Sequence, residues 1–155
     1  MSKDIYGYAG KQLRISLDNK EVIEEKLNEE TLKKYLGGTG YGIKVLYEEL
    51  DAGIDPLGKK NKMVFATSPL TDRRVPGGGS LEICFKSPLT ETWGEARVGD
   101  EFGFYLKKAG YDFLIIEGKA EEPSYIVIED NEVKIKSADH LLNKSSSDKE
   151  KIIKE

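Results

Sequence analysis

The chain has 155 residues, of which 38% are hydrophobic and 34% charged, and its formal net charge is −4. This length and balance are typical of one soluble globular domain, and the negative net charge argues against a nucleic-acid-binding protein, which usually carries a basic face. No apolar segment approaches the ~20 residues that span a bilayer, and the start lacks the apolar stretch of a signal peptide, so we expect a cytoplasmic protein with no membrane partner.

The first segment with a clear pattern predicts a β-hairpin followed by a helix. Residues 11–27 alternate apolar and polar side chains on both sides of "DNK". Asn28 then precedes "EETLKKYL" and is expected to act as its N-cap, with Leu32, Tyr35 and Leu36 forming an apolar stripe. The two glycines that follow are expected to end this helix.

A second helix is predicted over "GYGIKVLYEEL". Thr39 is its expected N-cap. Its expected buried side consists of Ile43, Leu46, Tyr47 and Leu50. A connection rich in turn residues, "DAGIDPLGKKN", follows it.

Two short strands, "KMVFAT" and "SLEICFK", then end at Pro69 and Pro88, because proline lacks an N–H and restricts the residue before it. Both copies of "SPLT" follow such a strand, and each leads into a loop with glycine and arginine, "RRVPGGGS" (residues 73–80) and "TETWGEARVG" (residues 90–99). We expect the two strands to carry these loops to the same edge of the molecule.

The rest of the chain predicts a helix over "DEFGFYLKKAG" with Asp100 as N-cap, a central strand over "YDFLIIEG" buried on both faces, and a second hairpin turning at Asp130 and Asn131. The fold class is therefore α+β, with mostly antiparallel β-sheets and a few short helices. We expect one domain over residues 1–142. Residues 143–155 form a polar tail, either a short amphipathic helix or a linker that begins a further segment.

Two glycine-rich segments do not fit nucleotide-binding motifs. "GGTGYG" follows a predicted helix, and Ile43 stands where a third small residue is required, so a corner between helices is favoured. Backbone N–H groups at such a helix start would still suit an anion. "GIDPLGKK" lacks the Ser or Thr of a phosphate loop, since Lys60 occupies that position.

The two loops after the SPLT segments are better candidates for a ligand site. Glycines leave the backbone of "PGGGS" bare, and Arg73 and Arg74 lie just upstream as donors for a phosphate. In the second loop, Trp93 would either pack as a lid or face a planar ligand, and Arg97 stands close to a helix start. The alternatives are a flexible hairpin loop with exposed arginines and a packed tryptophan.

Cys84 and His140 are the single cysteine and the single histidine. They cannot form a Cys/His zinc site or a four-cysteine iron–sulfur cluster by themselves, and a reducing compartment is the simpler interpretation. Cys84 alternates with apolar residues and is expected to pack in the core, whereas His140 is interpreted as structural or surface. We assign no catalytic residue and no metal ligand.

Six segments in order resemble the N-terminal domain of the tungsten-containing aldehyde ferredoxin oxidoreductase family. They are "YGYAGKQLRISL", "YLGGTGYGIKVLYEEL", "DPLGKKNKMVFATSPLT", "VPGGGS", "FKSPLTETWG" and "LKKAGYDFLIIEGKAEEPSYIVIED". The resemblance runs from Tyr6 to His140, and "KAGYDFLIIEGKAEEPSYI" is its most specific part. The family includes enzymes that oxidise aldehydes, formaldehyde and glyceraldehyde 3-phosphate, and relatives that reduce aryl-CoA thioesters.

The resemblance implies a base of two β-sheets on which tungstopterin rests, a bis-molybdopterin cofactor with tungsten or molybdenum. Helical domains, absent from this chain, would close the other side and hold a [4Fe–4S] cluster, and the whole enzyme would oxidise an aldehyde to a carboxylic acid and pass electrons to ferredoxin. The resemblance places the family's cofactor-contacting arginine at Ser80, its asparagine at Arg97 and its glycine at Gly99. We expect backbone donors at Gly78 and Gly79, with Ser80, Arg97 and Gly99 completing the cofactor-binding set.

By this reading the chain is a fragment of a longer oxidoreductase or a stand-alone relative that works with a partner subunit, and it is not catalytic alone. The chief alternative is a non-catalytic module of the same fold that binds a pterin or phosphate, or that serves subunit assembly. A nucleic-acid binder, which would show salt-sensitive retention, is the third reading. The aldehyde, the choice between tungsten and molybdenum, and a homo-oligomer are left open.

Overall fold

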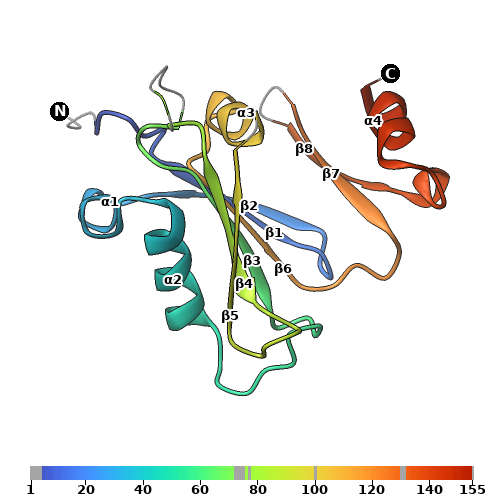
Figure 1. The fold of residues 1–155 in the computed structure, drawn as a ribbon, viewed down its shortest axis with the longest axis horizontal. Coiled ribbons are helices and arrows are strands. Elements are labelled where there is room, and N and C mark those ends of the chain that lie inside the picture. The colour runs from blue at the N-terminus through green and yellow to red at the C-terminus, as the bar shows by residue number, and fades with distance from the viewer. Residues whose placement is uncertain (1–4, 72–75, 77, 100, 130–131, 155) are drawn as a thin grey trace. The chain divides into compact units, whose positions relative to one another are not determined.

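A computed structural model describes residues 5–71, 76, 78–99, 101–129 and 132–154 (Figure 1). The chain divides into two compact units, residues 1–119 and 120–155. The strands of the first unit are β1 (Lys11–Ser16), β2 (Glu21–Lys26), β3 (Lys62–Ala66), β4 (Leu81–Lys86), β5 (Trp93–Val98) and β6 (Phe113–Glu117), and its helices are α1 (Glu29–Tyr35), α2 (Gly38–Glu49) and α3 (Phe102–Lys108).

The six strands form one sheet in the order β2-β1-β6-β3-β4-β5. β6 lies inside it and pairs in parallel with β1 and antiparallel with β3, while the remaining pairs are antiparallel. The predicted central strand and the mostly antiparallel α+β fold are thereby confirmed. An apolar run such as "FLII" suits this position because both of its faces are covered.

The first hairpin and its following helix form as predicted. β1 and β2 pair from Lys11 with Lys26 to Ser16 with Glu21. The side chain of Asn28 accepts a hydrogen bond of 2.7 Å from the backbone N–H of Thr31, which satisfies a free donor of the first turn of α1. The expected apolar stripe of α1 is narrower than predicted: Leu32 is buried, but Leu36 is 61% exposed.

α2 begins two residues earlier than expected, because its N-cap residue is Gly37 and not Thr39. Thr39 lies in the first turn and donates through its hydroxyl to Glu95. Gly37 has a φ of 145°, and a side chain there would collide with the carbonyl oxygen of Thr67. The glycine is required because the chain passes so close to the end of β3.

The predicted buried side of α2 is confirmed at Leu46, and Leu50 is partly buried against the core, but the prediction is wrong at Ile43 (48% exposed) and Tyr47 (87% exposed). The helix instead turns Gly42 and Val45 towards the sheet. At Gly42 an added Cβ would overlap the Sγ of Cys84, so the missing side chain lets α2 lie close against β4. α1 and α2 are drawn on the same side of the sheet in Figure 1. The core between these helices and the sheet consists of Leu32, Tyr41, Val45, Leu46, Val64, Ala66, Cys84, Phe113 and Ile115.

The predicted second loop is mostly a strand. Residues 93–98 form β5, which pairs with β4 from Lys86 with Trp93 to Leu81 with Val98. Gly94 and two charged residues, Glu95 and Arg97, are typical of a loop. Gly94 lies opposite Phe85, whose ring fills the space that a side chain would need, and an edge strand accepts exposed charge on its outer positions.

The two SPLT segments therefore lie at opposite ends of the sheet, contrary to expectation. β3 and β4 are antiparallel, with Ala66 opposite Glu82, so the chain leaves them in opposite directions. β5 then runs back alongside β4 and brings residues 97–99 to the end where β3 stops. The two predicted site segments meet there because of an extra strand, not because of the repeated tetrapeptide.

α3 follows as predicted, although its expected cap Asp100 lies outside the described residues. The second unit contains a hairpin of β7 (Ser124–Glu129) and β8 (Glu132–Ser137), a short 3₁₀ helix (Asp139–Leu141) and α4 (Ser146–Lys154). The hairpin is confirmed, and its turn residues Asp130 and Asn131 are also outside the described part. Of the two alternatives for the tail, the structure has the helix. The domain boundary at residue 142 stays a prediction.

Candidate functional site

The predicted site residues gather at one end of the sheet, which we call the rim: residues 78–80, which lead into β4, and residues 97–99, which end β5. Leu81 pairs with Val98, and Glu82 with Arg97, so the two segments are neighbours across the hairpin. The N-terminus of α2 lies at the same end, because the N–H of Gly38 donates to the carbonyl oxygen of Thr67 at 2.9 Å. Arg73 and Arg74 lie outside the described residues.

The rim presents open backbone. Gly79 and Gly99 are exposed, and a Cβ built on either would meet no other atom within 4 Å. Gly78 is buried, and Ser80 is half-buried with its carbonyl oxygen accepting a hydrogen bond of 3.1 Å from the hydroxyl of Thr71. Of the predicted positions Gly78, Gly79, Ser80 and Gly99, the structure thus leaves room for a ligand at two, Gly79 and Gly99.

Arg97 supplies the positive charge of the rim. Its side chain is 70% exposed, and its Nε lies 2.6 Å from Oε1 of Glu82. This hydrogen bond and the charge of Glu82 raise the pKa of Arg97 above its already high ordinary value. The guanidinium is therefore a permanent cation, with a geometry suited to phosphate or carboxylate oxygens.

Buried hydrogen bonds fix the base of the rim. Thr67 donates through its hydroxyl to the carbonyl oxygen of Asp112 at 2.8 Å. The carboxylate of Asp112 accepts from the N–H groups of Ala9 (3.0 Å) and Gly10 (2.7 Å) and pairs with Lys107 at 3.1 Å. Thr67, which directly precedes the first SPLT segment, is thus part of an ordered support.

Trp93 lies away from the rim. It begins β5, about 13 Å from Arg97 at ~3.3 Å per residue. It lines an apolar groove of about 370 Å³ with Ile43, Tyr47, Leu50 and Phe85, near the C-terminal end of α2. The indole therefore borders this groove and not the rim.

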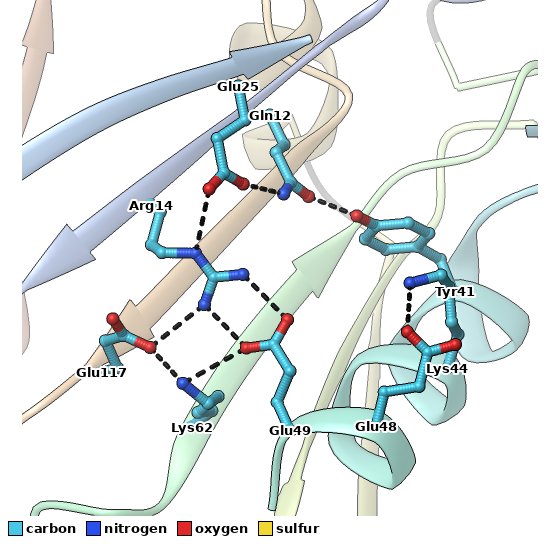
Figure 2. Close-up of polar contacts among 9 residues, drawn as sticks. All are labelled: Gln12, Arg14, Glu25, Tyr41, Lys44, Glu48, Glu49, Lys62 and Glu117. Carbon is cyan, nitrogen blue, oxygen red and sulfur yellow. Dashed lines mark hydrogen bonds and ion pairs between the residues drawn. The ribbon is translucent and has the colours of Figure 1, made fainter. Parts of the chain in front are cut away.

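A polar network centred on Arg14 was not anticipated (Figure 2). Arg14 donates to both oxygens of Glu49 (2.8 and 2.9 Å) and to Glu117 (3.0 Å), and Lys62 pairs with the same two glutamates. Desolvation lowers the pKa of Arg14, but its hydrogen bond to Glu49 and the surrounding carboxylates outweigh this and raise it overall. The sequence signal for this network is Arg14 itself, a charged residue between Leu13 and Ile15 in the middle of β1.

The same network continues to α2 through Gln12, which bridges Glu25 and the hydroxyl of Tyr41. Burial raises the pKa of Tyr41 far above its ordinary value, so the phenol stays a donor. Its ring stacks on Phe113 at 3.7 Å between centroids. Because each charged group of this network has an opposite partner, we interpret it as the structural joint between α2 and the sheet.

Within the described ranges, no three His, Cys, Asp or Glu side chains lie together so as to hold a metal ion. None of the helices in the same ranges is long and apolar enough to cross a membrane. Cys84 is fully buried, as predicted, and His140 is exposed with its ring 6.1 Å from that of Tyr125.

Comparison with known proteins agrees with the fold. Residues 12–155 match the family model for the aldehyde ferredoxin oxidoreductase N-terminal domain. The chain is 45% identical over 151 residues to the tungsten-containing aldehyde ferredoxin oxidoreductase of Pyrococcus horikoshii, covering 97% of this chain and 25% of that protein. It is 39% identical over 137 residues to the aliphatic sulfonate oxidoreductase, WOR-like subunit, of Pyrococcus furiosus, covering 86% and 22%.

Among solved structures, the active-site complex BamBC of benzoyl coenzyme A reductase with 1,5-dienoyl-CoA matches with a TM-score of 0.92 and 28% identity. That match covers 96% of this chain and 23% of the other. The fold and these matches define an α+β domain of the oxidoreductase class. The chain belongs to the aldehyde ferredoxin oxidoreductase family and corresponds to its N-terminal domain. It spans about a quarter of the length of the curated relatives that it matches.

Proposed function

We propose that the rim forms part of the binding surface for a bis-pterin tungsten or molybdenum cofactor. The observation that carries this proposal is the juxtaposition of an exposed guanidinium, Arg97, with open backbone at Gly79 and Gly99. A phosphate-bearing ligand needs such a cation together with main-chain atoms that it can approach closely.

The residues of the rim fit such a cofactor. Arg97 would hold a phosphate group, and Gly79 and Gly99 would line the approach, while the buried Gly78 and the half-buried Ser80 complete the predicted set. In a bis-pterin cofactor the pterins hold the metal, so this wall of the site needs no metal-ligating side chain. The bound metal would supply the redox chemistry, while this chain would supply position and charge.

The activity of the whole protein is part of the same proposal. We propose that it oxidises an aldehyde to a carboxylic acid in the cytoplasm, with a [4Fe–4S] cluster held outside this chain and ferredoxin as the electron acceptor. The names of the matched tungsten-containing relatives support this class of reaction. This chain contributes the cofactor base and no acid, base or metal ligand.

The rival is a non-catalytic module of the same fold. Ser80, which carries no charge at a position close to Arg97, favours this reading because it leaves the rim with fewer cations. The exposed apolar groove beside Trp93 would suit contact with another subunit. Such a module would bind a partner without a metal.

Recovery of the protein from its native host separates these functions. An affinity tag at the chromosomal locus recovers the protein at its natural length with its natural partners. We expect tungsten or molybdenum by mass spectrometry, and pterin by the fluorescence of its oxidised form. Arg97→Ala should lower both. Lys60→Gln is the matched control, since Lys60 is 69% exposed, pairs with Asp51 and lies at the opposite end of the sheet. A wild-type preparation with a partner but no metal or pterin would refute the cofactor role and support the rival.

A further inference from the structure

Among the described residues, Glu82 has a buried side-chain oxygen without a hydrogen-bond partner. Its side chain is only 7% exposed, Oε1 accepts from Nε of Arg97, and Oε2 is buried with no partner. A buried carboxylate is costly unless its oxygens are satisfied. Stability alone therefore does not account for a glutamate at this position.

The side chain of Glu82 lies between a cation and a helix N-terminus. On one side is the guanidinium of Arg97, its cross-strand partner. On the other is the first residue of α2, since a Cβ built on Gly38 would lie 3.3 Å from Cγ of Glu82. The N-terminus of a 12-residue helix carries partial positive charge that favours an anion. The carboxylate is thus held in place, and it in turn fixes one edge of the guanidinium.

The way in which Glu82 holds Arg97 leaves the rest of the guanidinium available. The bond is to Nε, and no described residue accepts a hydrogen bond from the two terminal nitrogens. Arg97 lies on the edge strand, and its long side chain would otherwise sample many rotamers. A guanidinium fixed at Nε presents its terminal N–H groups as a preorganised pair for phosphate oxygens.

We propose that Glu82 is a positioning residue for Arg97, which orients the guanidinium towards a phosphate bound at the rim. This inference rests on the proposed function, because it assumes that Arg97 meets a phosphate. It adds a residue that touches no ligand and acts through Arg97. The orphan oxygen Oε2 is the stability cost of this arrangement.

The neighbouring carboxylate, Glu95, serves as an internal comparison. It lies on the same face of β5 as Arg97. It accepts hydrogen bonds from the hydroxyl of Thr39 (3.2 Å) and from the indole N–H of Trp93 (3.3 Å). Glu95 has partners of its own, whereas the side chain of Glu82 is directed to Arg97. Loss of Glu82, and not of Glu95, should release the guanidinium.

The test is a titration of the ¹⁵N-labelled chain with inorganic pyrophosphate, followed by NMR at the amides of Gly79, Ser80 and Gly99 and at the Nε–H of Arg97. Glu82→Leu should weaken binding about tenfold, the effect of losing one charge-assisted interaction. Glu82→Gln keeps an acceptor for Nε and should bind between Glu82→Leu and wild type. Thermal unfolding should show both variants at least as stable as wild type, because each removes a buried charge.

The outcomes separate the two proposals. If Arg97→Lys weakens binding but both Glu82 variants bind like wild type, Arg97 acts without Glu82 and the positioning role is wrong, while the phosphate site stands. If the Glu82 variants lose stability and keep their affinity, Glu82 is merely structural. If wild type shows no shift at the rim, or Arg97→Lys binds unchanged, the phosphate site itself fails and the role of Glu82 with it. Arg97→Lys is used because it keeps a cation beside Glu82.

Discussion

The guanidinium of Arg14 and the carboxylate of Glu49 form a two-bond ion pair, with N–O distances of 2.8 and 2.9 Å, that joins β1 to α2. The side chain of Arg14 is only 14% exposed, and two further glutamates surround it (Figure 2). Because the two hydrogen bonds of this ion pair have a fixed geometry, the half-buried arginine fixes the orientation of α2 on the sheet as well as attracting the carboxylate by charge.

Replacing Glu49 should change the pH dependence of stability. Burial alone would raise the pKa of Glu49, but the hydrogen bond from Arg14 and the charges of Arg14 and Lys62 outweigh it, so its pKa is lowered. A carboxyl with a lowered folded-state pKa stabilises the fold above its unfolded-state pKa of about 4.3, and this contribution is lost as pH falls through the folded-state pKa. Urea unfolding of Glu49→Gln should therefore show a shallower loss of stability than wild type from about pH 5 to about pH 3. An unchanged slope would contradict the pairing.

Asp112→Ala should destabilise the protein by about 3–5 kcal/mol, because it leaves the buried Lys107 without its opposite charge and two N–H groups without an acceptor. Chemical denaturation at neutral pH measures this change. Asp51→Ala is the control: Asp51 is 79% exposed and pairs with an exposed lysine, so its loss should cost less than about 1 kcal/mol. Equal effects in the two variants would show that the buried pair is not formed.

Gly42→Ala should cost about 1–3 kcal/mol, because the new Cβ would overlap Sγ of Cys84 and lie 2.7 Å from its Cβ. Gly99→Ala is the matched control for stability, since nothing lies within 4 Å of a Cβ there. Thermal unfolding compares the two. The double variant Gly42→Ala with Cys84→Ala should recover part of the loss. A neutral Gly42→Ala would mean that α2 is not seated against β4 at this point.

The thiol of Cys84 should not react in the folded protein. Burial, and then the charges of Glu95 and Glu82, raise its pKa to about 12. At pH 8 about one thiol in ten thousand would be ionised, and the thiolate is the reactive form. Labelling with a thiol reagent should therefore be negligible in native buffer and complete in guanidinium chloride. Rapid native labelling would show that β4 opens readily or that the thiol is exposed.

Local sequence signals predicted the elements whose determinants are close in the chain. Asn28 caps α1 because its side chain needs only the N–H three residues later. The run from Phe113 to Glu117 is apolar enough to indicate an interior strand. These features depend on short-range chemistry that any single sequence displays.

The features that the sequence did not reveal depend on pairing between distant segments. Residues 93–98 read locally as a loop because the pairing of β5 with β4, in which Gly94 lies opposite Phe85, leaves no trace in the alternation of side chains. The sequence around Glu82 gives no indication of its role, because that role depends on a hydrogen bond from Arg97, 15 residues later. The apolar pattern of α2 does not indicate that Ile43 and Tyr47 are exposed, because a glycine, Gly42, and not an apolar residue, lies against Cys84 of β4. In each case the partner, and not the residue itself, decides the structure.

The parallel pairing of β1 with β6 joins Gln12 to Phe113 and Ser16 to Glu117. During synthesis the N-terminal hairpin therefore exists for about a hundred residues with one of its edges unpaired. Closing so long a loop costs conformational entropy before the β1–β6 contacts can form. Chains rich in such long-range contacts fold in milliseconds to seconds rather than microseconds. Until β6 ("FLIIE") is synthesised, the central strand of the sheet is missing and the edge of β1 stays unpaired. We expect a chaperone to engage the chain at this open edge.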